Sequence, residues 1–450
     1  MVRVLPGWVP DAVFYQIFPD RFGRGAGAWP DEGAGATRQM CGGDLDGIRS
    51  ALPYIEELGA NALYLTPIFT ASSYHRYDTE DYFSVAPELG GNAALARLVD
   101  AARSRGMRIV LDGVFNHASH RHPHFSDVVR RGRASQYWDW FRVHGTAVVE
   151  RPEPNYDCWA GVPSMPEWNH ANPEARAYLL SVVRHWIREC GIDGWRLDTT
   201  EYLPPDFVRE IDRAAKAESP DTYILGEVMG LGTPWFRHDA LDGVMHYKLY
   251  ERMVSFIAEE GWDAARFAAS VRSIWRSYTE AGNYGSMTLV GSHDKARFVT
   301  LCAGNAQKLL LATALVATFP GAPAIYYGDE IGMSGGEDPD NRRCFPWDEA
   351  TWDRAVLERT RALLALRRRL PVLRTGSLTF VAAEGRVVVF RRELGRERAL
   401  VALNADSKEG TSVSLRDGGP YVEALSGKAL GASASLPPLG ALVAYTGARA

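Results

Sequence analysis

Short, nearly continuous apolar runs alternate with longer amphipathic segments from the start of the chain to Leu370. Eight of these runs have the length and composition of buried strands, at residues 13–18, 62–65, 107–112, 194–198, 223–227, 243–246, 287–290 and 324–327. Such runs are typical of parallel strands that are buried on both faces. Eight of them alternating with helices predict an α/β protein built on a (β/α)₈ TIM barrel.

One predicted helix carries signals at both of its ends. Asn172 and Pro173 precede a stretch in which apolar residues recur at helical spacing, and Gly191 follows it. Asparagine is a favoured N-cap, proline suits the first helical position, and glycine commonly ends a helix. We therefore expect a helix between Asn172 and Gly191, directly before the fourth strand.

Two regions depart from the barrel pattern. Residues 117–170 show no clear periodicity and are rich in Trp, His, Pro and Arg. A loop of this length is usually functional, and here it would project from the C-terminal face of the barrel. From Pro371 onward, short alternating segments separated by Gly, Ser, Asn and Asp predict an antiparallel β-sandwich.

The predicted domain organisation follows from these two departures. The barrel covers residues 1–116 and 171–370, an inserted domain covers 117–170, and the C-terminal sandwich covers 371–450. The arginine triplet at 367–369 lies at the junction with the sandwich. We interpret it as the solvated C-terminus of a helix, where cations suit the helix dipole.

Composition and charge narrow the classes of partner. Hydrophobic residues make up 46% of the chain, which is enough for a full core, and the net charge is -5. Nucleic acid is not expected as a partner, because phosphate binding needs a basic surface. No apolar run reaches the ~18 residues that span a bilayer, and the N-terminus lacks the apolar stretch of a signal peptide. We therefore expect a cytoplasmic protein with no membrane partner.

The five cysteines are scattered through the chain, at positions 41, 158, 190, 302 and 344. They form no CxxC pair and no Cys/His cluster, so neither a zinc site nor a disulfide framework is indicated. Reduced thiols in the cytoplasm are the interpretation that fits this pattern.

Four carboxylic residues stand at or just beyond the C-terminal ends of predicted strands: Asp112, Asp198, Glu227 and Asp294. In a (β/α)₈ barrel these ends converge on one mouth, where such enzymes hold their active sites. Each residue alone could instead cap a helix or form a loop salt bridge. Together they predict a metal site or an acid/base site, because carboxylates are rarely buried without a partner.

The neighbours of these carboxylates favour catalysis. His117, Arg196 and His293 stand beside them in the sequence. Glycosyl transfer uses such a set, with one ionised carboxylate as nucleophile and one protonated carboxyl group as acid. A neighbouring arginine would keep the nucleophile ionised.

The segments around the four carboxylates also carry a family resemblance. They read DGVFNH at 112–117, GWRLD at 194–198, GEV at 226–228 and GSHD at 291–294. These segments resemble the four signature segments of the α-amylase family (glycoside hydrolase family 13), in the family's order and on the family's strands. Further matches at 14–22, 42–45, 75–78 and 328–333 extend the resemblance over the chain. It implies that 117–170 is the family's domain B and 371–450 its domain C.

The resemblance also implies roles for individual residues. Asp198 would be the nucleophile, Glu227 the general acid/base, and Asp294 a third carboxylate that binds substrate hydroxyl groups. Other side chains would bind the sugar or hold the nucleophile: Arg196, His117, His293, Tyr77, Asp338, Arg342 and His75. The last of these could equally be a packing residue of its loop.

Within the family, the segment MPEWN at 165–169 resembles the neopullulanase and cyclomaltodextrinase branch. That branch usually carries an extra N-terminal β-domain that helps to build a dimer, whereas this chain begins directly at the first barrel strand. We therefore expect a more open cleft and no dimer mediated by that domain.

A second departure from the branch is the pair Glu201-Tyr202, where the branch normally shows Asn-Glu. Glu201 lies in the loop after the predicted fourth strand and is expected to accept hydrogen bonds from an acceptor sugar. The alternative is a solvent-facing loop carboxylate or a charge at a helix N-terminus.

The predicted function is a retaining α-glucan hydrolase whose partner is an α-glucan oligosaccharide. It would cleave α-1,4 bonds of maltooligosaccharides or cyclodextrins, with α-1,6 cleavage or transglycosylation as further activities. The same-family alternative is an α-glucosidase or a glucan-transferring enzyme. A catalytically inactive sugar-binding or assembly protein is a third hypothesis, against which the presence of all three catalytic carboxylates argues.

No cofactor is required for this chemistry, and the sequence leaves calcium open. Asn116 matches a calcium ligand of the family, and Gly42 and Asp44 match part of a second site. The loop that would complete the second site is replaced by residues 23–35, whose charged oxygen donors are Asp31 and Glu32. Because calcium prefers ~6–8 oxygen ligands, Asn116 is alternatively a hydrogen-bonding residue below the site.

Overall fold

The structure is a computed structural model that describes residues 3–23, 40–150, 153–416 and 419–446. The chain forms two compact units. The first contains Met1–Gly7, Ile17–Leu52 and Ala62–Val244, and the second contains Trp8–Gln16, Pro53–Asn61 and Met245–Ala450. Within the described ranges, no helix combines the length and apolar character needed to cross a bilayer.

The first unit contains a run of parallel strands that pair in order along the sheet: β2 (Ala62–Leu65), β5 (Arg108–Gly113), β6 (Gly194–Leu197), β7 (Tyr223–Gly226) and β8 (Gly243–Val244). Strands β2, β6 and β7 are buried along their whole length, which accounts for their continuous apolar character. The register places Asp112 of β5 beside Arg196 of β6. This pairing positions the centre of the candidate site.

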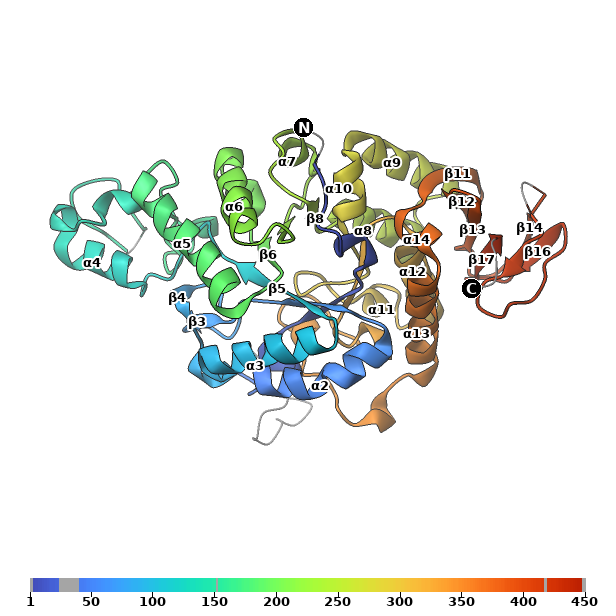
Figure 1. Cartoon of the computed structure of the whole chain (residues 1–450), viewed down its shortest axis with the longest axis horizontal. Coiled ribbons are helices and arrows are strands. Elements are labelled where there is room, and N and C mark those ends of the chain that lie inside the picture. Colours follow the sequence, from blue (N-terminus) through green and yellow to red (C-terminus); the bar gives the residue numbers. More distant parts are fainter. Residues whose placement is uncertain (1–2, 24–39, 151–152, 417–418, 447–450) are drawn as a thin grey trace. The chain divides into compact units, whose positions relative to one another are not determined.

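The helices of this part of the chain follow the predicted alternation with the strands: α1 (Pro19–Phe22), α2 (Leu45–Leu58), α3 (Gly91–Ser104), α5 (Pro173–Cys190), α6 (Pro205–Glu218) and α7 (Thr233–Arg237). Helix α5 confirms its sequence signals. The Asn172 side chain accepts hydrogen bonds from the backbone of Glu174 and Ala175, and Gly191 ends the helix in the left-handed conformation at φ 67°. Helices α5 and α6 lie side by side (Figure 1).

Between β5 and α5 the chain is held mainly by aromatic packing. Its regular elements are short: α4 (Pro123–Arg131), η4 (Gly132–Ala134), η5 (Trp138–Trp140) and η6 (Trp159–Gly161). Trp168 is completely buried and stacks on Phe141 with ring centroids 4.8 Å apart. Aromatic residues packed from irregular backbone have no helical or strand period, which explains why the sequence showed none. The predicted limits of this domain, 117–170, stay a prediction.

A small hairpin of the first unit was absent from the sequence prediction. It consists of β3 (Phe69–Ala71) and β4 (Thr79–Val85), with the 3₁₀ helix η3 (Pro87–Leu89) after it. Its register shifts twice, between Phe69 and Thr70 and again between Thr70 and Ala71. Such irregularities break the alternation by which a strand is recognised.

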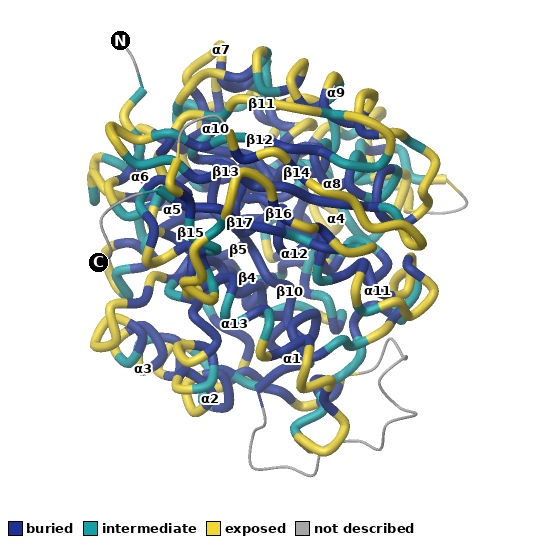
Figure 2. The backbone as a smooth tube through the Cα atoms, turned by 90° about the vertical axis from the view of Figure 1, so that its right-hand side faces the viewer, coloured by how far each residue is buried: buried dark blue, intermediate teal, exposed yellow. Residues whose placement is uncertain are grey.

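The remaining parallel strands pair in the second unit, where β1 (Phe14–Ile17) lies beside β10 (Ala322–Tyr326) and β10 beside β9 (Met287–Leu289). Strand β10 is buried along its whole length (Figure 2). The complete strand order is β8-β7-β6-β5-β2-β1-β10-β9, and an isolated parallel bridge joins Met245, after β8, to Met287. This is the strand order of a (β/α)₈ barrel, and the eight strands stand where the sequence predicts them.

The helices of the second unit follow its strands: α8 (Tyr247–Met253), α9 (Ala264–Ser277), α10 (Glu280–Gly285), α11 (Phe298–Leu301), α12 (Ala306–Thr318), α13 (Arg354–Arg369) and α14 (Pro371–Thr375). Shorter helical turns complete it: η1 (Val9–Asp11), the π-helix η8 (Val254–Ala258), η9 (Asp329–Ile331), η10 (Asp340–Arg342) and η11 (Glu349–Thr351). Asp353 caps α13 by accepting from the backbone of Ala355 and Val356.

Two antiparallel sheets form the C-terminal part of the second unit. One has the strand order β11 (Ser377–Glu384), β12 (Val387–Leu394), β13 (Glu397–Asn404), β17 (Ala441–Thr446) and β15 (Val422–Glu423), and the other pairs β14 (Thr411–Ser414) with β16 (Ser433–Leu436). They share one apolar core that includes Leu400, Val413, Leu436 and Leu442. Two antiparallel sheets over one core are the arrangement predicted for this segment.

The prediction of a solvated arginine triplet is wrong for Arg367, which is 1% exposed in the last turn of α13. Its guanidinium donates to the main-chain oxygens of Ala317, Phe319 and Leu373. The reason is packing, because α13 ends beside the C-terminus of α12, whose last carbonyl groups need donors. Arg368 and Arg369 are exposed, as predicted.

A second buried guanidinium contacts the same region. Arg392 of β12 is 0% exposed and donates to the main-chain oxygens of Thr318, Leu373 and Gly376 at 2.6–2.8 Å. Within the described residues, the acceptors of Arg367 and Arg392 are all main-chain carbonyl groups. The end of α12, the turn at α14 and strand β12 are therefore tied together by two cations.

We expect Arg392→Ala to lower the free energy of unfolding by roughly 3–5 kcal/mol, because several buried carbonyl groups lose a charged donor at once. Urea unfolding followed by circular dichroism measures the change. The matched control is Arg391→Ala on the same strand, whose side chain is 26% exposed and pairs with Glu393. That control should cost less than about 1 kcal/mol. Equal losses in the two variants would contradict the role given to Arg392.

Candidate active site

Arg196 stands at the centre of the first group of predicted site residues. It lies on β6 and is completely buried, and its guanidinium contacts three carboxyl groups. Nη1 donates to Oδ1 of Asp198 at 2.7 Å and to Oδ1 of Asp112 at 2.9 Å, while Nη2 lies 3.0 Å from Oε1 of Glu227. Three neighbouring strands, β5, β6 and β7, thus bring the predicted nucleophile and the predicted acid/base to one cation.

The charges in this group are strongly coupled. Burial opposes the positive charge of Arg196, but Asp112 and Glu227 outweigh it and hold the pKa of the guanidinium well above its ordinary value. Burial also raises the pKa of Asp112, against the opposing effect of Arg196. One buried cation facing three carboxyl groups favours a proton on one of them. A cluster of this kind can supply both an ionised carboxylate and a carboxylic acid.

Two tyrosines anchor Asp112 from the other side. Tyr64 donates its hydroxyl group to Oδ2 at 2.7 Å, and Tyr77 donates to the same oxygen at 3.1 Å. The Tyr77 ring stacks on His75 with centroids 5.9 Å apart. Tyr77 and His75 are therefore together, as the sequence predicts, and their contact with a sugar stays a prediction. Tyr64 was missed because a tyrosine inside a buried strand looks like a core residue.

His117 is buried and stacks on Trp159 with centroids 5.7 Å apart and planes inclined by 13°. Burial lowers the pKa of His117 to about 3, so its imidazole is neutral at ordinary pH. Its Nε2 atom has no hydrogen-bond partner within the part of the chain that the structure describes. A neutral ring with one unused nitrogen can exchange a hydrogen bond with a sugar hydroxyl group.

The second group of predicted site residues lies in the second unit and is centred on Asp294, which follows β9. Tyr247 donates its hydroxyl group to Oδ2 of Asp294 at 2.9 Å, and Nε2 of His293 lies 3.1 Å from Oδ1. Arg342 places Nη2 3.8 Å from Asp294 and Nη1 3.1 Å from Asp338. The structure therefore brings together the four residues of this unit that the sequence predicts.

A glutamine fixes the imidazole of His293. Nε2 of Gln16, on β1, lies 2.6 Å from Nδ1 of His293 and can donate only if that nitrogen carries no proton. The other ring nitrogen, Nε2, faces Asp294. Sequence reasoning missed Gln16 and Tyr247. A polar glutamine within the apolar run 13–18 was the available signal for the first.

Residues 16–361 match the family model of the alpha-amylase catalytic domain. The chain belongs to the α-amylase family. A cyclomaltodextrinase from Geobacillus thermopakistaniensis (strain MAS1) is 41% identical over 453 residues, covering 97% of this chain and 77% of the relative. The fold and the enzyme class predicted from the sequence are confirmed: a TIM barrel with C-terminal antiparallel sheets, and a glycoside hydrolase.

Two solved structures are similar to this chain over almost its whole length. The cyclic alpha-maltosyl-(1→6)-maltose hydrolase from Arthrobacter globiformis, in complex with that sugar, is 38% identical with a TM-score of 0.92, covering 99% of this chain and 100% of the other. The debranching enzyme from Nostoc punctiforme is 37% identical with a TM-score of 0.89, again covering 99% and 100%.

Glu201, the clearest departure from the α-amylase family pattern, has a partner that the sequence did not reveal. It lies in the 3₁₀ helix η7 (Thr200–Tyr202), and its two carboxylate oxygens accept from the backbone amides of Met229 and Gly230, each at 3.0 Å. Glu201 is exposed and stands in the first turn of η7, as the alternative predicts. Its contact with backbone amides was not predicted, because such amides have no sequence signature. Its predicted hydrogen bonds to an acceptor sugar stay a prediction.

The residues that match calcium ligands of the α-amylase family are already engaged in the protein. Asn116 donates its side-chain amide to Glu167 at 3.3 Å, and Oδ1 of Asp44 accepts from the backbone of Gly47 at 2.7 Å. The described residues contain no group of three or more His, Cys, Asp or Glu that could hold a metal ion. Asp31 and Glu32 lie outside the described residues. Calcium binding stays a prediction.

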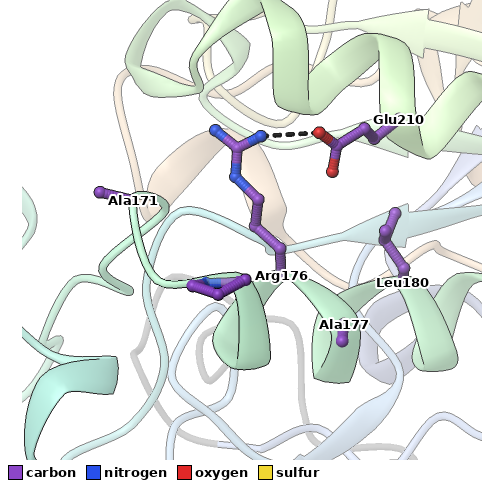
Figure 3. A pocket seen from close by; sticks show the side chains of 6 residues that line it. Ala171, Arg176, Ala177, Leu180 and Glu210 are labelled. Atoms are coloured by element: carbon purple, nitrogen blue, oxygen red, sulfur yellow. Dashed lines mark hydrogen bonds and ion pairs between the residues drawn. The ribbon is translucent and has the colours of Figure 1, made fainter.

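A separate hollow of about 450 Å³ lies against α5 and is lined by Ala171, Pro173, Arg176, Ala177, Leu180 and Glu210 (Figure 3). Nη1 of Arg176 pairs with Glu210 and with Asp206, each at 2.8 Å. The two charged residues that line the hollow, Arg176 and Glu210, are therefore paired with each other. They have no contact with the predicted site residues in the described contacts, and we assign them no chemistry.

Proposed function

We propose that the chain is a retaining α-glucan hydrolase that cleaves α-1,4 bonds of maltooligosaccharides or cyclodextrins. The observation that carries this proposal is the contact of Asp198 and Glu227 with the same buried guanidinium. A retaining mechanism needs its two carboxyl groups about 5–5.5 Å apart, closer than an inverting one. Two carboxylates that share one arginine are held close together, which supports the retaining assignment.

The proposed reaction has two steps. Glu227 donates a proton to the glycosidic oxygen while the Asp198 carboxylate attacks the anomeric carbon, and the aglycone leaves with its new hydroxyl group. Glu227 then takes a proton from water, the water oxygen attacks the same carbon from the opposite face, and Asp198 is released. Two inversions return the α configuration. Arg196 stabilises the carboxylate form of Asp198 through its 2.7 Å hydrogen bond.

The remaining predicted residues are proposed to bind the sugar. Asp294, oriented by Tyr247 and His293, would accept hydrogen bonds from substrate hydroxyl groups and favour the distorted ring of the transition state. Arg342 and Asp338 would hold the donor-side glucose. His117 would contribute its Nε2 atom, and Tyr77 its ring, to the sugar in the cleaved subsite.

The relatives support the substrate class and suggest a second linkage. One is named for cyclomaltodextrin, and another for hydrolysis of a cyclic sugar with 1→6 bonds. We therefore include cyclic α-glucans among the substrates and α-1,6 cleavage or transglycosylation among the activities. We also propose that the enzyme works in the cytoplasm, in line with its five free cysteines.

The test is a time course of products from maltotriose, β-cyclodextrin, pullulan and starch, with anomers followed by NMR in the first minutes. We expect α products, opening of β-cyclodextrin and release of short maltooligosaccharides. Initial β products would refute the retaining mechanism. Glucose released from maltotriose with intact cyclodextrin would favour the α-glucosidase alternative, and longer products the transferase. No product from any substrate would favour the inactive barrel.

A further inference from the structure

The loops after β6 and β7 are joined by a ladder of hydrogen bonds. The backbone amide of Thr199 donates to Oε2 of Glu227 at 2.7 Å, and that of Thr200 donates to the Glu227 carbonyl group at 3.1 Å. Two residues further along both loops, Glu201 accepts from Met229 and Gly230. The segment that follows the proposed nucleophile is thus attached to the segment that contains the proposed acid/base.

We propose that Glu201 is a positioning residue that fixes the backbone after Glu227 and thereby aims the Glu227 carboxyl group at the glycosidic oxygen. This inference rests on the proposed function, in which Glu227 is the proton donor. In this role Glu201 acts through the backbone amides of Met229 and Gly230 and does not itself transfer the proton.

The strength of the contact supports this role. A carboxylate that accepts two backbone N–H groups makes charge-assisted hydrogen bonds, which are about twice as strong as neutral ones. Met229 stands only two residues after Glu227, so a shift of its amide is transmitted almost directly to the acid. Displacements of ~1 Å at a reacting group can cost ~100-fold in rate.

The close approach leaves room for a side chain at position 230 only if the Glu201 carboxylate moves. A Cβ atom built on Gly230 would lie 2.7 Å from Oε1 of Glu201, too close for any real side-chain carbon. Glu201 and Gly230 therefore fit each other as a pair. The pair can be broken from either side, which gives two independent variants for a test.

The conformation of Thr199 shows that this segment is held in place. Its φ of 43° lies in the left-handed region, which is costly for a β-branched residue. Such a conformation persists only where surrounding contacts determine it. Thr199 itself donates to Glu227, and two residues later Glu201 accepts from Gly230. The ring of Tyr202 adds a contact with Trp159, with centroids 4.7 Å apart.

The test compares two leaving groups. Cleavage of maltotriose needs a proton on the departing sugar, whereas fluoride leaves α-maltosyl fluoride with little need of an acid. We expect Glu201→Gln to lower kcat/KM for maltotriose about tenfold or more. The kcat/KM for α-maltosyl fluoride should change less than about threefold. Gly230→Ala should give the same pattern, because its new methyl group displaces the Glu201 carboxylate.

Two further variants make the outcome decisive. Glu210→Gln removes a carboxylate that pairs with Arg176 at the hollow beside α5, and it should leave both substrates unchanged. Glu227→Gln should show the leaving-group pattern in its strongest form. If it does not, the proposed function fails, whatever Glu201 does.

Suppose that Glu227→Gln loses activity on maltotriose but much less on α-maltosyl fluoride. The positioning role is then wrong if the Glu201 and Gly230 variants lower kcat/KM equally for the two substrates, and also if they lower it for neither. Melting temperatures separate these outcomes from loss of folding. Should Glu201→Gln fail to fold, Gly230→Ala decides the question alone.

Discussion

Asp198→Ala is expected to lower kcat/KM for maltotriose by about 10⁴-fold or more, the largest effect of any single change in this chain. The carboxylate of Asp198 forms the covalent bond to the sugar in the proposed reaction, whereas Asp112, which shares Nη1 of Arg196, is held by the hydroxyl groups of Tyr64 and Tyr77. The deletion also removes one negative charge beside that buried guanidinium. Initial rates measure the loss of chemistry, and calorimetry of maltotriose binding shows whether affinity is lost as well.

A small nucleophile gives this prediction a positive control. Azide should enter the space left by the carboxylate and convert α-maltosyl fluoride to the β-maltosyl azide, since only one inversion then occurs. Asp206→Ala, which removes an exposed partner of Arg176, should keep full activity. If Asp198→Ala keeps more than about 1% of the parent rate, Asp198 is not the nucleophile.

Glu227→Gln is expected to lower kcat/KM for maltotriose by about 10²–10⁴-fold, the range of general acid catalysis. Glutamine keeps the shape of the side chain and a carbonyl oxygen for the amide of Thr199, but its amide protons are not acidic enough to be transferred to the leaving group. The loss should be much smaller with α-maltosyl fluoride. The alkaline fall of kcat/KM with maltotriose, which reports loss of the acid's proton in the free enzyme, should also disappear.

Steady-state rates between pH 4 and pH 9 on both substrates measure the dependence on the leaving group and the alkaline fall of kcat/KM. A variant that loses the same factor on both substrates, with the parent pH profile intact, would show that Glu227 is not the acid.

The barrel and its carboxylates could be predicted because both depend on local pattern. Strands buried on two faces give continuous apolar runs, and the residues that follow them meet at one edge of a parallel sheet. Asp112 and Arg196 illustrate this, since a register between two predicted strands places them side by side.

The partners of the site residues depend on packing between distant segments, and their sequence signals are weak. Tyr64 and Gln16 sit within apolar strands, and each orients a site residue through one polar atom. Glu201 binds backbone amides, which every residue except proline possesses. Arg367 was expected at the surface because the residues next to it in the sequence give no sign of the carbonyl groups of α12 to which it donates.

Arg367 and Arg392 have a consequence for the order in which the second unit assembles. Arg367 of α13 reaches its acceptors only when the end of α12 and the turn at α14 are in place. Arg392 of β12 needs the same two segments, and both cations donate to the carbonyl group of Leu373. A partly folded chain would have to dehydrate a guanidinium without its carbonyl partners, which is costly. The C-terminal sheet and the last helices of the barrel should therefore open and close as one cooperative block, with the same protection of their amides against exchange with solvent.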